Sequence, residues 1–193
     1  MRHVPLLALC LLASACRIEK VRAGDTTRLG VDPGPGLPQC GISSASRVSE
    51  DGLGLLRIGT SIDAIRGGCA IISERTTDSI GEARVDLGRD TAIVALRNGS
   101  IHRIRLTHQA YRTADSLGVG THISTLLRLR EATAITDGNR LYAISPASCG
   151  LRFMLLDPAP TRASSRSGRE ALRRLSGETR TRELEIVGCF RRR

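Results

Sequence analysis

The stretch "IGTSIDAI" at residues 58–65 recurs as a close variant, "VGTHISTL", at residues 119–126, 61 positions further along the chain. In the first copy Gly59 breaks the preceding segment, Thr60 is a natural N-cap, and Asp63 follows three residues later. This arrangement is a short-acid version of the capping box that begins many helices. Apolar residues then share one face and a glycine follows them, which predicts a helix of about two turns.

The second copy repeats the same signals over a longer apolar stripe. Gly120 ends the preceding segment, as Gly59 does in the first copy, and Thr121 is the predicted N-cap. The match also extends backwards, because "DGLG" at residues 51–54 corresponds to "DSLG" at residues 115–118. A short helix that begins in the same way therefore occurs twice.

Strand-like runs follow each predicted helix. Residues 91–108 form two alternating runs around Asn98-Gly99, which is the strongest short-range signal for a two-residue hairpin turn. Residues 140–157 form two further runs around a Ser-Pro-Ala-Ser turn. We therefore predict an α+β fold of two repeated units, each a short helix followed by an antiparallel β-meander. Neither unit has enough apolar surface to stand alone, so they are expected to form one sheet or two packed sheets.

This order of elements resembles a known family. The Gly-Thr helix start followed by a small antiparallel sheet is similar to the SmpA/OmlA group, which includes the outer-membrane lipoprotein BamE. The tandem arrangement resembles the β-lactamase inhibitor protein, in which two such units form one continuous sheet. The resemblance rests on residues 51–65 and 115–126, and it implies a fold. It does not carry β-lactamase binding over to this chain.

The amino terminus has the layout of a secretory signal peptide over residues 1–15, with a basic start, a brief apolar run and small residues before Cys16. The run is too short for a transmembrane helix. "LASAC" at its end resembles a bacterial lipobox, in which Cys16 would become the lipid-modified first residue. Ala13-Ser14-Ala15 also fits an ordinary signal peptidase site. We expect export to the periplasm or outer membrane with a lipid anchor at Cys16; the alternative is a secreted soluble protein.

The number of cysteines in the mature chain favours lipidation of Cys16. Of the six cysteines, Cys10 is removed with the signal, and a lipidated Cys16 leaves four that can pair fully in an oxidising compartment. A zinc site of four thiolates lacks any C-x-x-C pair, so we predict no metal and no cofactor. Four cysteines allow three connectivities, of which we prefer the most local: Cys40 with Cys69, and Cys149 with Cys189.

The composition outside the two units defines the remaining segments. Residues 16–47, rich in Gly, Pro and charge, are predicted to be a flexible tether. The first unit then spans residues 48–112, the second residues 113–157, and residues 158–193 form a basic loop with a closing strand. The chain carries a net charge of +10. Because export removes it from the cytoplasm and only four Phe and Tyr are present to stack on bases, we exclude a nucleic-acid partner.

Catalytic signals are weak, and we assign no catalytic residue. No nucleophile elbow, zinc-protease helix or phosphate-binding glycine loop is present. An enzyme would need a histidine within hydrogen-bond reach of a carboxylate. The candidates are His102 and His108 on one predicted strand and His122 at the second helix, with Asp63, Asp115 or Asp137 as the acid.

Two classes of function follow. We expect a non-catalytic exported envelope protein, a lipoprotein that acts as a protein-binding or assembly module through the exposed face of its sheet. The partner is then an envelope protein, and the membrane is reached through Cys16. The alternatives are a hydrolase-type enzyme built on the histidines above, or a protein that adheres to an anionic cell surface.

Overall fold

The computed structural model describes residues 40–156 and 168–189 of the 193-residue chain. The chain groups into two compact units, Met1–Pro33 and Gly34–Arg193, and every described residue belongs to the second. The predicted signal peptide, Cys16 and most of the tether lie outside the described residues. Within residues 40–156 and 168–189, no helix combines the length and apolar character needed to cross a membrane.

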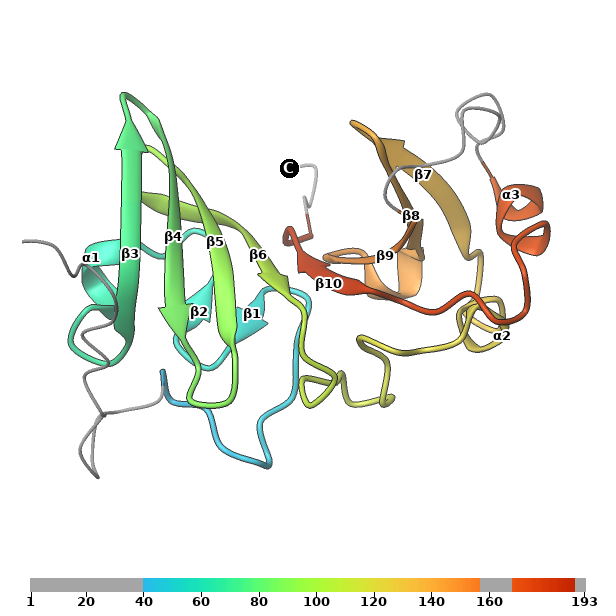
Figure 1. Ribbon diagram of the computed structural model, residues 1–193, viewed down its shortest axis with the longest axis horizontal. Helices are drawn as coiled ribbons and strands as arrows, with labels where there is room; N and C mark the ends of the chain where they lie inside the picture. Colours follow the sequence, from blue (N-terminus) through green and yellow to red (C-terminus); the bar gives the residue numbers. More distant parts are fainter. Residues whose placement is uncertain (1–39, 157–167, 190–193) are drawn as a thin grey trace, which may run out of the picture. The chain divides into compact units, whose positions relative to one another are not determined.

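One antiparallel sheet of eight strands dominates this unit (Figure 1). Short strands β1 (Gly52–Leu53) and β2 (Leu56–Arg57) pair separately from it. In spatial order the large sheet contains β3 (Ala70–Thr77), β4 (Ile80–Asp86), β5 (Thr91–Arg97), β6 (Ser100–Leu106), β10 (Glu183–Ile186), β9 (Leu151–Leu156), β8 (Arg140–Ile144) and β7 (Thr133–Asp137).

Both predicted hairpins are present. Arg97 of β5 pairs with Ser100 of β6, and Asn98 and Gly99 between them have positive φ of 50° and 72°, as a two-residue turn of this kind requires. The second hairpin joins β8 to β9 through a 3₁₀ turn at Pro146–Ser148.

A third hairpin, β3–β4, was not predicted. It begins directly after Cys69, and its strands pair from Ala70 opposite Asp86 to Thr77 opposite Ile80. Its two-residue turn contains Asp78 with a positive φ of 52°. Asp tolerates this conformation better than most residues because its short side chain can bond the local backbone.

The closing strand was predicted, but its position was not. β10 lies between β6 and β9 and is antiparallel to both. Leu184, for example, pairs with Leu106 on one side and with Phe153 on the other. The last strand of the chain therefore completes the sheet in its middle.

Three short helices accompany the strands. Ser61, and not Thr60, caps the first helix, and its side chain accepts a hydrogen bond from the Asp63 N–H. In the second helix the N-cap is His122, which makes no side-chain cap bond. The helices are α1 (Ile62–Ile65) and α2 (Ile123–Leu126), of four residues each, and α3 (Arg169–Arg173), of five.

The predicted α+β fold of repeated helix-plus-meander units is therefore wrong. The described residues are mostly β, with one eight-stranded sheet, one two-stranded sheet and only three short helices. The physical reason is length: a capping signal begins a helix, but a helix of one turn barely offsets its nucleation cost. The long β-branched stretches form strands instead, including a hairpin between the first helix and the strands predicted to follow it.

The core is largely aliphatic and lies on one face of the sheet. Ile62 and Ile65 of α1, Ile123 and Leu126 of α2, and Leu172 of α3 belong to the same buried cluster as the inward residues of the strands. All three helices therefore pack with the core, and the other face of the sheet is left without a helix among the described residues.

Candidate functional site: the open face of the sheet

The face of the sheet opposite the core carries its charged side chains. On β4, buried Ala83 and Val85 alternate with exposed Glu82 and Arg84, as side chains of a strand point alternately to the two faces. We call the face that bears Glu82 and Arg84 the open face. Following the strand pairing, its residues include Ser73, Arg75 and Thr77 (β3), Ile80, Glu82 and Arg84 (β4), Ile93, Ala95 and Arg97 (β5), Arg103 and Arg105 (β6), Glu183 and Glu185 (β10), Arg152 and Met154 (β9), Arg140 and Tyr142 (β8), and Ile135 and Asp137 (β7).

Glu185 lies in the middle of the open face and is fully buried. Arg103 of β6 and Arg152 of β9 flank it, with N–O distances of 3.4 Å and 3.5 Å. Both carboxylate oxygens of Glu185 are buried and accept no hydrogen bond from the residues that the structure describes. Burial raises the pKa of the Glu185 carboxyl, and the two guanidinium groups oppose that rise.

Further ion pairs extend this group along the sheet. Arg152 bonds Asp137 at 2.8 Å, Arg140 bonds Glu183 at 3.2 Å, and Arg105 bonds Glu82 at 2.9 Å. Positive and negative side chains therefore alternate over β6, β10, β9, β8 and β7 and largely neutralise one another. We call this set the central network: Arg103, Arg105, Asp137, Arg140, Arg152, Glu183 and Glu185.

A hollow of about 320 Å³ lies over the central network. Tyr142 lines it and is itself buried, and burial raises the pKa of its hydroxyl, with the nearby Glu185 adding to the shift. The other residues around this hollow are Arg103, Arg105, Asp137, Gly138, Asn139 and Arg140.

The β3–β4 end of the open face has a different character. Ile72 and Ile80 are 60% and 64% exposed, which is unusual for large apolar side chains. Arg75 and Arg84 are exposed too, and neither forms an ion pair with another described residue. A second hollow, of about 360 Å³, is lined here by Ile72, Ser73, Arg75, Glu82 and Arg84. We call Ile72, Arg75, Ile80 and Arg84 the hairpin patch.

The three candidate histidines do not converge. His102 lies on β6 where the pairing with β5 is irregular, and burial lowers the pKa of its imidazole, with Arg103 and Arg97 adding to the shift. His108 lies beyond the end of β6, contrary to the single strand predicted for both, and its Nδ1 accepts the Ala110 N–H at 3.1 Å.

The candidate acids are engaged elsewhere or exposed. Asp63 pairs with Arg66 at 2.8 Å, Asp137 pairs with Arg152, and Asp115 is exposed. In residues 40–156 and 168–189, no hydrogen bond or ion pair joins His102, His108 or His122 to a carboxylate. The geometry thus offers no histidine–acid pair of the kind that general acid–base chemistry needs.

Two disulfides join Cys40 to Cys69 and Cys149 to Cys189, which are the local pairs preferred from the sequence. Their Cα–Cα distances are 4.3 Å and 5.2 Å. Disulfides persist in oxidising compartments, so they are consistent with an exported protein.

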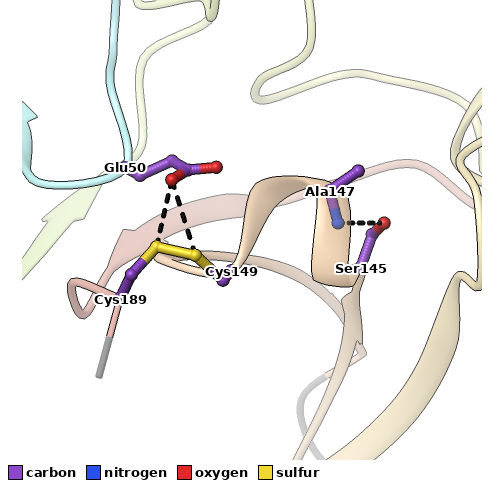
Figure 2. The surroundings of a disulfide bond; sticks show 5 residues. All are labelled: Glu50, Ser145, Ala147, Cys149 and Cys189. Carbon is purple, nitrogen blue, oxygen red and sulfur yellow. Dashed lines mark hydrogen bonds between the residues drawn. A yellow bond between two sulfur atoms is a disulfide. The ribbon is translucent and has the colours of Figure 1, made fainter. Parts of the chain in front are cut away.

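Glu50 lies against the second disulfide, as Figure 2 shows. Its Oε2 is 3.0 Å from the sulfur of Cys189 and 3.5 Å from that of Cys149. Gly150 makes this approach possible, because a Cβ at that position would lie 2.0 Å from the Glu50 carbonyl oxygen. Glu50 and the two cysteines also have the spacing of metal ligands, but the disulfide leaves no thiolate to bind an ion.

Neither a protein-family model nor a curated protein sequence matches the chain. Among solved structures, the chain is similar to the uncharacterised protein YfeY from Escherichia coli, with a TM-score of 0.49 and 15% sequence identity. The alignment covers 73% of this chain and 99% of that one. This likeness is too distant to support an inference, so the functional proposal below rests on the open face alone.

Proposed function

We propose that this chain is a non-catalytic exported protein of the bacterial envelope that binds a partner protein on its open face. The observation that carries the proposal is a sheet face that no described helix covers, where exposed Ile72 and Ile80 lie beside arginines. Exposed apolar side chains together with Arg are typical of protein interfaces. A surface that faces only water has no need of the two isoleucines.

The size of the open face supports a protein as the occupant. Eight strands at about 4.8 Å each give a width of about 38 Å, and strands of about 18 Å give an area of about 700 Å². A standard protein interface buries about 800 Å² on each partner. The two hollows are open and lined mainly by charged groups, whereas small-molecule sites are enclosed and mostly apolar.

Photo-crosslinking in the exporting cell tests the proposal. A photoreactive residue at Ile80 probes the open face, and one at Ser124, exposed on α2, serves as the control on the core side. We expect a discrete crosslinked protein from position 80 only. Equal capture at both positions, or no protein captured from position 80, would contradict binding through the open face.

Lipid anchoring at Cys16 is part of the proposal and has its own test. Intact mass of the protein recovered from the envelope, reduced and non-reduced, reports both the lipid and the free thiols. We expect a chain that begins at Cys16 with added acyl mass and no free thiol. An unlipidated chain with one reactive thiol would make the protein a soluble secreted one.

A further inference from the structure

β3 is an edge strand with unusual exposure. It is the last strand of the sheet on one side, so one row of its backbone groups has no strand partner among the described residues. Seven of its eight residues are exposed; only Ile71 is partly covered. Such an edge is a template for pairing with another chain, and proteins usually shorten it, bend it or place charges on it.

The protection of this edge is incomplete. A pairing irregularity between Ile71 and Ser73 disturbs the start of β3, but the register is regular from Ser73 to Thr77. Glu74 is tied to Arg66, which follows α1 on the core side of the sheet. The remaining charge on the edge, Arg75, points to the open face and is not neutralised there.

The charge next to the edge is positive. Glu82, the acid opposite Arg75, is bonded by Arg105 at 2.9 Å. Arg84 lies opposite Ser73, whose small side chain leaves the space between Arg84 and the strand edge open as the 360 Å³ hollow. A carboxylate on an added strand would therefore meet two guanidinium groups that form no ion pair with an acid among residues 40–156 and 168–189.

We propose that β3 accepts an extended, acidic segment of the partner protein as an additional strand, with the carboxylates of that segment meeting Arg75 and Arg84. Apolar side chains of the same segment pack against Ile72 and, at the other end of the hairpin, against Ile80. Strand addition supplies backbone hydrogen bonds, and alternate side chains on the open face supply specificity. This inference rests on the proposed function and names the surface and the chemistry of the partner.

Titration of the purified full chain tests the inference. The probe is a fluorescent ten-residue peptide with threonine at every second position and glutamate and valine in turn at the others, so that glutamate and valine share one face of the added strand. Its counterpart with lysine in place of glutamate is the control. We expect binding of the acidic peptide alone, weakened about fivefold in R75Q/R84Q because two exposed charge pairs are lost. The matched variant R140Q/R152Q, on the same face but within the central network and away from Glu82, should bind the acidic peptide as the unmodified chain does.

Hydrogen exchange separates strand addition from simple charge attraction. With the acidic peptide bound, the amides of β3 that face away from β4 should exchange more slowly. Binding without this protection, or equal weakening in both double variants, would overturn the inference. Equal binding to phosphatidylglycerol vesicles with loss in R75Q/R84Q would assign the patch to anionic lipid and would also overturn it, as would self-association that protects β3 without peptide.

A failure of strand addition at β3 can be distinguished from a failure of the proposed function. If position 80 captures a protein in cells but the acidic peptide leaves β3 unprotected, the partner binds the open face in another way. If no open-face position captures a protein, the proposed function fails whatever the peptide does.

Discussion

The two ends of the open face use the same residue type for different purposes. In the central network each arginine has a carboxylate within ion-pair distance, and Glu185 at its centre is fully buried. In the hairpin patch Arg75 and Arg84 have no such partner in the part of the chain that the structure describes, and exposed Ile72 and Ile80 belong to the same patch. An arginine that forms an ion pair with a carboxylate of the sheet stabilises the sheet. An arginine without such an ion pair is available to bind another molecule.

The largest expected effect is on the stability of the central network. R103M/R152M leaves the buried Glu185 carboxylate without a cation, which typically costs about 3 to 5 kcal/mol in the free energy of unfolding. Urea denaturation at neutral pH measures this change. The matched variant R75M/R84M changes exposed side chains and should shift the free energy by no more than about 0.5 kcal/mol. Equal losses in the two variants would remove the distinction between the two ends.

The pH dependence of stability sharpens the assignment of Glu185. Because burial raises the pKa of its carboxyl, the folded chain binds more protons than the unfolded chain between the ordinary and the raised pKa. The contribution of this group to stability is therefore lost as pH rises through that window. Denaturation of the unmodified chain and E185Q over a pH series should show E185Q gaining relative stability across it. A pH-independent difference would mean that Glu185 is not the buried acid described here.

A smaller effect concerns the Cys149–Cys189 disulfide. The Glu50 carboxylate is a negative charge close to both sulfurs of Cys149–Cys189, and the group that attacks a disulfide is a thiolate anion. At about 4 Å in water the repulsion is about 1 kcal/mol, or about fivefold in rate. E50Q should therefore speed reduction of this bridge by dithiothreitol about fivefold and leave Cys40–Cys69 unchanged, as mass spectrometry of trapped thiols would show. Equal rates in E50Q and the unmodified chain would contradict this role.

Local signals predicted the turns, several strands and the cysteine pairs. The dipeptide Asn98-Gly99 is sufficient to predict its turn. The strand-like runs on either side of the two predicted turns correctly predicted β5, β6, β8 and β9. The β3–β4 hairpin was missed although part of its signal is present: β-branched residues stand on both sides of Asp78-Ser79, and charged and apolar residues alternate from Glu82 to Asp86. The capping signals at Thr60 and Thr121 each lie one residue before the true N-cap, Ser61 or His122, and such a signal does not fix how far a helix extends.

The candidate site depends on pairing that no local pattern contains. The insertion of β10 between β6 and β9 brings Glu185 next to Arg103 and Arg152, which are 82 and 33 residues away in the sequence. One signal was available, because Glu183 and Glu185 alternate within an otherwise apolar strand. The hairpin patch could not be predicted without the β3–β4 hairpin. Whether its arginines lack an ion-pair partner among the described residues depends on the positions of the nearby carboxylates, which only the structure gives.

The most direct test of the account compares two matched double variants in the exporting cell. The photoreactive residue at Ile80 is combined with R75Q/R84Q or with R140Q/R152Q, after circular dichroism has shown that both variants fold. We predict that R75Q/R84Q loses most of the crosslinked partner and that R140Q/R152Q retains it. Retention by R75Q/R84Q together with loss in R140Q/R152Q would contradict binding through the hairpin patch and would place it over the central network.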